Sequence, residues 1–397
     1  MKKGLALVLT AAIAMSSLVG CSSSQPTGSA AAGTAAATNN TTAQGGGGDL
    51  QGANVFMFKS TGNSFGDKMY EGFKEVITKD GGKPAYKSPA ETTVAAQVKL
   101  IDELITQKVA SITISTNGDT GYDEVFKKAK AAGIKIVSVD SKASPDYRIT
   151  HVDPTSQEGV GQSLVQAATM IALKKDYPAN GDLKAATEDA LKSYSGKEIK
   201  LGVLSASIDT PVQNGWIAKM EEELKRDVYK GKVSATLTKK YGNDDPTAST
   251  TQANAFISEN NVDVIISPTT VGMVAAGQAL KSNPSCKIKL TGLGLPSEMS
   301  NFMPAKASDN AFDAVCPYMF LWDVYDLGRV AAGATWASIK DGYTGAVGSS
   351  FKMGAFGDYK ERTFTTIQHP ADKGTEVLVG KPYSFYKENI AEWVKKL

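Results

Sequence analysis

Short apolar runs alternate with longer amphipathic stretches between about Ala53 and Asp140. In the longer stretches apolar residues recur every three or four positions, which is the spacing of one helix face. The apolar runs end in turn-forming residues, as buried strands do. The pattern predicts strands over Asn54–Phe58, Lys83–Lys87, Ser111–Ser115 and Ile134–Val139, and helices over Phe65–Lys79, Val94–Gln107 and Asp123–Ala132.

The same alternation restarts at Ser156. It predicts helices over Ser156–Leu173, Gln213–Arg226, Pro246–Asn260, Val271–Ser282 and Val324–Lys340, and strands over Lys200–Ser205, Val233–Tyr241, Val262–Ser267, Ile288–Leu293 and Ala311–Leu321. The polar segment 175–197 is expected to be a surface insertion with its own short helix. The tail beyond Asp341 has strand-like pieces at Phe364–Gln368 and Val377–Val379 and a last short helix at Lys387–Val394. Apolar strands between amphipathic helices predict an α/β fold with two doubly wound parallel sheets.

The first residues of the chain have a different composition. Two lysines precede an apolar run from Leu5 to Val19, and Cys21 follows a small residue, which resembles the lipobox of bacterial lipoproteins. We expect residues 1–20 to be a signal peptide and Cys21 to be acylated, although a plain signal peptide cut nearby is the alternative. Residues 22–48 contain no charged, aromatic or large aliphatic residue, so 21–52 is interpreted as a flexible linker. The protein is then extracytoplasmic and lipid-anchored to the cell membrane.

The rest of the composition is that of a soluble globular protein, with 42% hydrophobic and 21% charged residues. The chain has 43 basic and 41 acidic residues, and the signal peptide holds two of the basic ones. The mature chain therefore has balanced charge, which argues against nucleic acid as a partner. Cys286 and Cys316 could pair in an exported protein or could be two small buried residues.

Polar and aromatic side chains gather where the predicted strands end. Ligands of doubly wound sheets bind beyond the carboxyl ends of the strands, so these residues are the candidate binding site. The candidates are Lys59, Asn63, Phe65, Asn117, Asp140, Gln213, Asn214, Pro268, Thr270, Trp322 and Asp323, with Trp216 close by. Amides, carboxylates and rings suit a polyhydroxylated ligand better than a phosphate. Any single Asp or Asn among them could instead be a helix cap, and Trp216 could be part of the core.

Catalytic motifs are missing from the sequence. His151 and His369 each lack a neighbouring partner, and there is no metal-binding His or Cys spacing. There is no Gly-x-Ser-x-Gly motif or phosphate-binding loop, and Pro296 interrupts a weak dinucleotide-like run that begins at Gly292. We therefore predict a binding protein with no cofactor and no metal rather than an enzyme. A glycoside hydrolase that uses Asp140 and Asp323 is the enzymatic alternative.

Several motifs resemble the type I periplasmic sugar-binding proteins, the capture subunits of ABC importers, and most closely their rhamnose-binding and autoinducer-2-binding subgroup. The resemblance covers nearly all of residues 53–397. It is carried by the stretches Phe58-Lys59-Ser60-Thr61-Gly62-Asn63-Ser64-Phe65, Val137-Ser138-Val139-Asp140-Ser141, Gln213-Asn214-Gly215-Trp216, Pro268-Thr269-Thr270-Val271-Gly272, Gly292-Leu293-Gly294-Leu295-Pro296-Ser297-Glu298-Met299 and Leu321-Trp322-Asp323.

The resemblance implies ligand contacts at Lys59, Phe65, Asp140, Gln213, Pro268 and Trp322. Autoinducer-2 receptors have an Asp at the position of Val212 and an Ala at that of Thr270. These two departures favour a sugar or polyol, with a rhamnose-like ligand preferred.

The resemblance also implies two lobes joined by a three-strand hinge. The expected N-terminal lobe is 53–153 plus 324–345, and the expected C-terminal lobe is 154–323 plus 346–397. A monomer would close on its ligand and present it to the permease of the importer. A sensor lipoprotein that presents its ligand to a receptor is the alternative, and a cytoplasmic repressor is disfavoured because no helix-turn-helix precedes residue 53.

Overall fold

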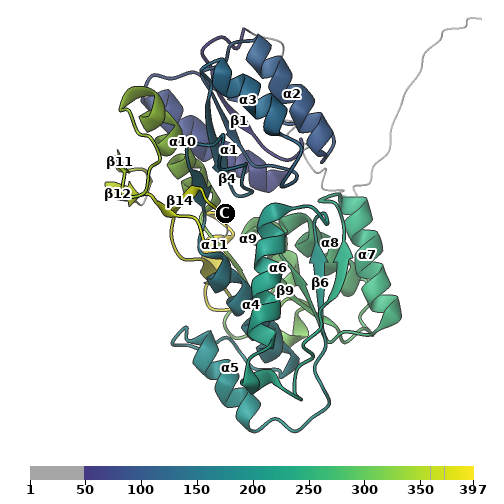
Figure 1. Cartoon of the computed structure of the whole chain (residues 1–397). Coiled ribbons are helices and arrows are strands. Elements are labelled where there is room, and N and C mark those ends of the chain that lie inside the picture. The colour runs from purple at the N-terminus through teal and green to yellow at the C-terminus, as the bar shows by residue number, and fades with distance from the viewer. Residues whose placement is uncertain (1–48, 358, 371) are drawn as a thin grey trace, which may run out of the picture. The chain divides into compact units, whose positions relative to one another are not determined.

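The computed structural model describes residues 49–357, 359–370 and 372–397 (Figure 1). The predicted signal peptide, Cys21 and the linker up to residue 48 lie outside the described residues. Among the helices that are described, none is both long and apolar enough to cross a membrane.

A mixed, mainly parallel sheet forms the first half of the body. Its order is β13-β14-β5-β4-β3-β1-β2, and every neighbouring pair is parallel except β13–β14 at one edge. The strands are β1 (Asn54–Met57), β2 (Pro84–Tyr86), β3 (Ser111–Ile114), β4 (Lys135–Val139), β5 (His151–Asp153), β13 (Ile367–Gln368) and β14 (Thr375–Leu378). The central strands are fully buried, which explains their continuous apolar runs.

Helices cover both faces of this first sheet. They are α1 (Ser64–Lys79), α2 (Val94–Thr106), α3 (Asp123–Ala131) and α10 (Val324–Lys340). The helices α1 and α10 pack tightly because each carries a glycine where they cross: a Cβ on Gly72 would lie 1.9 Å from the carbonyl oxygen of Tyr325, and one on Gly328 would lie 1.8 Å from that of Met69. The helices α2 and α3 bury a separate apolar cluster with β1 and β3 on the opposite face.

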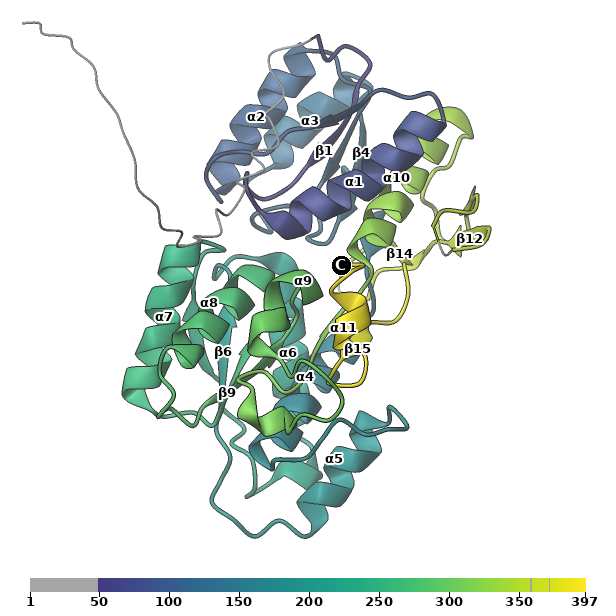
Figure 2. The same cartoon turned by 180° about the vertical axis from the view of Figure 1, so that it is seen from behind.

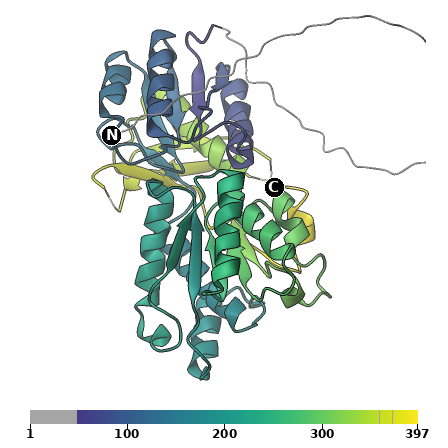
Figure 3. The same cartoon turned by 90° about the vertical axis from the view of Figure 1, so that its right-hand side faces the viewer.

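The second sheet is entirely parallel, with the order β7-β6-β8-β9. Its strands are β6 (Leu201–Ser205), β7 (Thr238–Tyr241), β8 (Val264–Ser267) and β9 (Lys289–Gly292). The helices around it are α4 (Gln157–Ala172), α6 (Pro211–Leu224), α7 (Pro246–Glu259) and α8 (Thr270–Lys281), and they lie on both faces of the sheet (Figure 3). The α/β class with two parallel, helix-covered sheets is therefore confirmed.

The chain passes between the two halves, which we call the N-lobe and the C-lobe, three times. It leaves the N-lobe after β5 and enters α4, returns from β10 (Met319–Leu321) into α10, and leaves again from β14 to β15 (Tyr383–Phe385). On the C-lobe side β10 and β15 pair with each other, and Phe320 bridges to Leu293 after β9. Figure 2 shows β14, β15 and α11 (Ile390–Trp393) along this connection. The expected three-strand hinge is present.

The tail departs from the sequence prediction. We expected 346–397 to belong to the C-lobe, but β14 pairs with β5 in the N-lobe sheet, and β11 (Ser350–Met353) pairs with β12 (Arg362–Thr365) beside α10. Only the last part, from β15 onward, joins the C-lobe. The reason is that β5 leaves an open parallel edge, which the tail fills from a distant part of the chain.

The predictions of individual helices and strands were only partly correct. The predicted strand over Ala311–Leu321 is wrong for its first part, since Ala311–Asp313 is a 3₁₀ turn and only Met319–Leu321 is a strand. The insertion does contain a short helix, α5 (Leu183–Lys192). Three more short segments complete the described elements: η1 (Asp227–Tyr229), α9 (Pro296–Met299) and η2 (Ser300–Phe302). Cys286 and Cys316 are free thiols, and burial raises the pKa of Cys316.

Candidate ligand-binding cleft

A cavity lies where strand ends of the N-lobe and the C-lobe face each other. It encloses about 400 Å³ of empty space, a figure that includes the solvent at its open side. The N-lobe contributes Phe58, Lys59, Asn63, Phe65 and Asp140, the C-lobe contributes Gln213, Trp216, Asp244, Pro268, Thr269, Thr270, Val271 and Leu293, and the hinge contributes Leu321 and Trp322.

On the N-lobe side the cavity is lined by a buried ion pair. Lys59 Nζ lies 3.0 Å from Asp140 Oδ2, and the two side chains are only 4% and 5% exposed. The hydroxyl of Ser115 donates to the same carboxylate oxygen at 2.8 Å. Asp140 has a φ of 61°, a left-handed conformation that is unusual outside glycine and common at functional sites. The turn after β4 thus directs this carboxylate at Lys59.

On the C-lobe side Gln213 is held in one orientation. Its Oε1 accepts from the backbone N–H of Ala206 at 2.8 Å and from the hydroxyl of Ser205 at 2.6 Å. A backbone N–H can only donate, so the oxygen of the carboxamide is fixed on this side and Nε2 is on the other. No described residue accepts from Nε2, which leaves two hydrogens for a ligand.

Asp244 adds a second carboxylate to the C-lobe side. It follows β7, has a φ of 50°, and accepts from the hydroxyl of Thr269 at 2.5 Å. Burial raises the pKa of Asp244, and the negative charge of Asp140 adds to this, whereas the positive charge of Lys59 and the Thr269 hydrogen bond lower it. Lys59 therefore interacts with carboxylates from both lobes.

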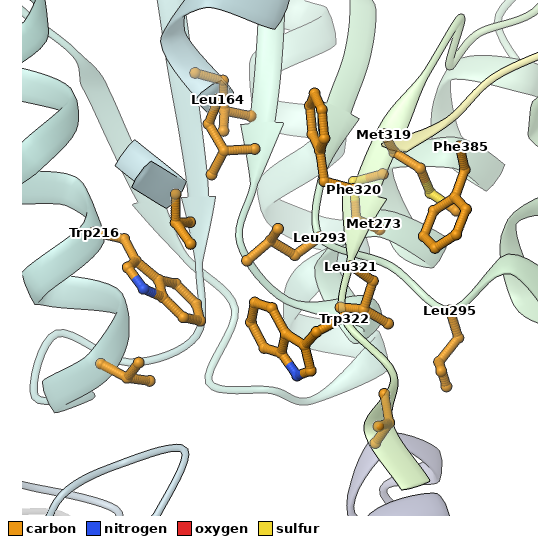
Figure 4. Close-up of a cluster of buried hydrophobic side chains, with 14 of the residues drawn as sticks. Leu164, Trp216, Met273, Leu293, Leu295, Met319, Phe320, Leu321, Trp322 and Phe385 are labelled. Atoms are coloured by element: carbon orange, nitrogen blue, oxygen red, sulfur yellow. The ribbon is translucent and has the colours of Figure 1, made fainter. Parts of the chain in front are cut away.

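Two tryptophans bring unused hydrogen-bond donors to the cavity. Trp216 on α6 and Trp322 after β10 lie with ring centroids 5.6 Å apart (Figure 4). Both indoles are almost completely buried, and neither Nε1 has a hydrogen-bond partner among the described residues. Buried N–H groups without a partner are rare and costly, and they mark a place where a ligand or water accepts.

Eight of the eleven candidate residues line the cavity: Lys59, Asn63, Phe65, Asp140, Gln213, Pro268, Thr270 and Trp322. The other three do not line it. Asn117 donates to the backbone carbonyl of Lys59 at 2.9 Å, so it supports the segment that carries Lys59. Asn214 donates to the carbonyl of Ile208, and Asp323 caps α10 and accepts from the hydroxyl of Tyr359.

Sequence reasoning missed Asp244 and left Trp216 undecided between cleft and core. Asp244 stands just beyond the end of the predicted strand Val233–Tyr241, so the search of strand ends would have found it had that strand been included. The apolar lining by Phe58, Val271, Leu293 and Leu321 carries no sequence signal that separates it from the core.

The arrangement combines fixed donors, acceptors and aromatic or aliphatic surface in one cleft. Ring faces and aliphatic groups suit the C–H surface of a small ligand, while amides, indoles and carboxylates suit its hydroxyls. A buried site of this kind discriminates against analogues that lack a hydroxyl, because its polar groups would stay unpaired.

Comparisons with known proteins agree with this architecture. Residues 54–343 match the model of a periplasmic binding protein domain. The structure of an ABC transporter solute-binding protein from Clostridium phytofermentas with bound L-rhamnose is 32% identical, with a TM-score of 0.74 over 87% of this chain and 98% of that one. A sugar ABC transporter structure from Actinomyces odontolyticus is 27% identical, with a TM-score of 0.59 over 87% of this chain and 98% of that one.

LsrB from Clostridium saccharobutylicum in complex with AI-2 shares the fold at 21% identity, with a TM-score of 0.70 over 86% of this chain and 99% of that one. The family match covers well over half of the chain, and the two lobes joined by three chain crossings fit this family. The chain therefore belongs to the periplasmic binding protein family, with the type I arrangement of its lobes.

Proposed function

We propose that this protein is the extracytoplasmic solute-binding lipoprotein of an ABC importer and that it captures a small neutral sugar or polyol, rhamnose-like in preference, in the cleft between its lobes. The observation that carries the proposal is the cleft itself, which is lined by a buried Lys59–Asp140 pair, an oriented Gln213 and two indoles whose N–H groups have no partner among the described residues. The family membership and the L-rhamnose bound to a 32% identical relative support it.

Each polar group has a definite part in this proposal. Gln213 Nε2 and the two indole N–H groups donate to ligand oxygens, while Asp140 accepts from hydroxyls. Phe65, 6.2 Å from Trp322 between ring centroids, and Leu321 cover apolar ligand surface such as a methyl group. Thr270, in the place where autoinducer-2 receptors have an alanine, offers one more hydroxyl.

The same geometry supports capture without chemistry. The hydrolase alternative needs Asp140 and Asp323 to flank a bond, but Asp323 caps a helix and does not line the cleft. Because both lobes supply contacts, the ligand stabilises the closed form, and closure changes the surface that the monomer presents to the permease. The proposal therefore includes no catalytic residue and no cofactor.

Isothermal titration calorimetry with three sugars tests the ligand class. L-Rhamnose, L-mannose and L-lyxose differ at one position, which carries a methyl group, a hydroxymethyl group or no carbon. We expect L-rhamnose to bind most tightly, because the apolar lining favours the methyl group, and autoinducer-2 to bind weakly or not at all. The absence of heat from these sugars and from D-arabinose and D-fucose would remove the sugar proposal.

A matched pair of variants locates the binding. Gln213→Leu removes the oriented donor and is expected to weaken binding by about tenfold or more, since a hydrogen bond in a dry site is lost. Gln162→Leu, whose side chain bonds to Glu158 on the surface of α4, is the control and should bind as the unchanged protein does. Equal affinities for the two variants would place the ligand elsewhere.

Lipid anchoring at Cys21 is a separate part of the proposal. Metabolic labelling of the expressed chain with an alkyne fatty acid should mark the protein and its Cys286→Ser variant equally. The Cys21→Ser variant should carry no label and appear in the soluble fraction. Labelling that survives in Cys21→Ser would contradict the anchor.

A further inference from the structure

A second cluster of chemically active side chains lies at the hinge, away from the lining of the cleft. The strands β5 and β14, from which the chain makes its first and third crossings, pair in parallel with Glu376 opposite His151. Val152 and Val377 point into the apolar core that includes α10. Side chains alternate along a strand, so His151, Asp153 and Glu376 all lie on the opposite face of the sheet.

His369, just after β13, completes the cluster. The potential ligand atoms of Asp153, His369 and Glu376 all lie within 4.8 Å of one another, and all three residues are buried. His369 Nε2 is 3.7 Å from Glu376 Oε2, and His151 Nε2 is 3.8 Å from Asp153 Oδ2. The two imidazole centroids are 6.0 Å apart, so the fold gathers the only two histidines of the chain at one place.

Among the described residues, no Lys or Arg lies at ion-pair distance from Asp153 or Glu376, and the charges of Lys142 and Arg148 act on them only from farther away. Arg148 donates from one nitrogen, Nη2, to both carboxylate oxygens of Asp372, at 3.0 Å each, so its ion pair is with Asp372 and not with the cluster. The ion-pair partners found for Asp153 and Glu376 within the described part of the chain are both imidazoles. Asp153 is 1% exposed, and its Oδ1 has no hydrogen-bond partner among the described residues. A buried carboxylate oxygen without a partner is costly, and a cation would satisfy it.

Both imidazoles are oriented as metal-binding histidines are. His369 Nδ1 is 3.4 Å from Asp372 Oδ1, and His151 Nδ1 is 3.0 Å from the hydroxyl of Ser138. Histidines that bind a metal through Nε2 commonly use Nδ1 to bond a carboxylate or another oxygen, which fixes their tautomer. In each residue it is Nε2 that faces the carboxylates of the cluster.

We propose that Asp153, His369 and Glu376 form a binding site at the hinge for one divalent transition-metal ion, with Zn²⁺ as the expected metal. His151 Nε2 lies beside this site and would be the fourth ligand. One or two imidazoles with two carboxylates is a donor set that Zn²⁺ accepts, whereas Ca²⁺ and Mg²⁺ prefer oxygen alone. Tetrahedral bonds of about 2.0–2.2 Å place ligand atoms about 3.3–3.6 Å apart, so the side chains need to close in by about 1 Å.

Such an ion would tie β5 to the loop after β13 and to β14. Two of the three chain crossings begin on these strands, so the metal would stiffen the N-lobe side of the hinge without entering the sugar site. The inference revises the sequence prediction of no metal and does not rest on the proposed sugar ligand.

Nitrogen NMR of the unchanged protein tests this inference without a variant. The full mature chain, free of any histidine tag and stripped with EDTA, carries two imidazoles, so both can be followed by selective ¹⁵N-histidine labelling. We expect the Nε2 resonance of His369 to shift on addition of Zn²⁺ and to stop changing at one equivalent. Imidazole spectra that do not respond to excess Zn²⁺ would overturn the proposal.

Variants then assign the carboxylates by calorimetry with ZnCl₂. Asp153→Asn and Glu376→Gln keep the shape of the side chain. Each should weaken Zn²⁺ binding by at least 10–100-fold, which is the loss commonly seen when a group that only hydrogen-bonds to a metal ligand is removed. Glu259→Gln, from an exposed pair with Lys240, is the control and should leave binding unchanged. Zn²⁺ binding that is equal in all three would mean that the ion sits on other carboxylates, and the proposal would fall.

Discussion

Two aspartates at the ends of neighbouring parallel strands of the N-lobe have opposite surroundings. Asp140 follows β4 and has Lys59 at 3.0 Å and the Ser115 hydroxyl at 2.8 Å. Asp153 ends β5 and has an imidazole at 3.8 Å and one carboxylate oxygen without a partner among the described residues. Both side chains are buried. Position in the fold is nearly the same, so the difference lies in what the adjacent strands supply.

The order of strands explains this difference. Lys59 follows β1 and reaches past β3, whose Ser115 also contributes, to the end of β4. Beyond β4 the sheet continues with β5 and β14, which bring Glu376 instead of a cation. Burial, the neighbouring Glu376 and Asp140 raise the pKa of Asp153, and burial raises that of Glu376 to about 7. One strand end thus has a completed ion pair that lines the cleft, and the next has acids with no Lys or Arg at ion-pair distance among the described residues.

Removing the cation of the completed pair should give the largest effect. Lys59→Met leaves Asp140 buried and uncompensated, which commonly costs about 3–5 kcal/mol of unfolding free energy. Urea denaturation followed by circular dichroism measures it. Lys128→Met, from an exposed pair with Asp102, should stay within about 1 kcal/mol of the unchanged protein. Equal midpoints for the two variants would show that the Lys59 pair is not buried as described.

The contrasting strand end should tolerate the loss of its charge. Asp153→Asn in the presence of EDTA removes a carboxylate that has no Lys or Arg at ion-pair distance among the described residues, so we expect the unfolding free energy to change by no more than about 1 kcal/mol. Asp140→Asn is the matched comparison and should be clearly less stable, because it leaves the buried charge of Lys59 without this ion-pair partner. A larger loss in Asp153→Asn than in Asp140→Asn would reverse the comparison.

The free indole donors of the cleft should matter for the ligand more than for the fold. Trp322→Phe keeps a ring and removes the N–H, and we expect sugar affinity to fall about 2- to 10-fold by calorimetry. The stability of the free protein should not fall for lack of the N–H, since that group has no hydrogen-bond partner in the part of the chain that the structure describes. Trp393→Phe in α11 serves as the control. A loss of stability without a loss of affinity would assign Trp322 to the core.

The smallest expected effect is on the pH dependence of stability. Because the pKa of Asp244 is raised above its ordinary value of 3.8, the folded protein holds this proton when the unfolded chain has lost it. The contribution of Asp244 to stability is therefore present at low pH and is lost as the pH rises from about 3.8 through the folded pKa. The Asp244→Asn variant has no carboxyl at this position, so its stability does not decrease in this way. Its melting temperature relative to that of the unchanged protein should therefore rise as the pH increases over that window. A relative stability that falls instead would mean that Asp244 is paired in the fold.

Most of the cleft could be predicted from the sequence, whereas the hinge cluster could not. Lys59, Asp140 and Pro268 follow strands whose apolar runs are plain, and the carboxyl ends of parallel strands meet at one edge. The segment His151–Asp153 has no such run, since two of its three residues are polar. Its partner β14 comes from a distant tail, and no local pattern specifies that pairing.

If the cleft binds a small polyhydroxylated ligand, both lobes should contact it. A crystal structure of the protein grown with L-rhamnose tests this. We expect one sugar within hydrogen-bond distance of Asp140 from one lobe and of Gln213 Nε2 from the other, with an indole N–H donating to it. A sugar bound on one lobe alone, or an unoccupied cleft at a concentration that calorimetry shows to be saturating, would rule out binding between the lobes.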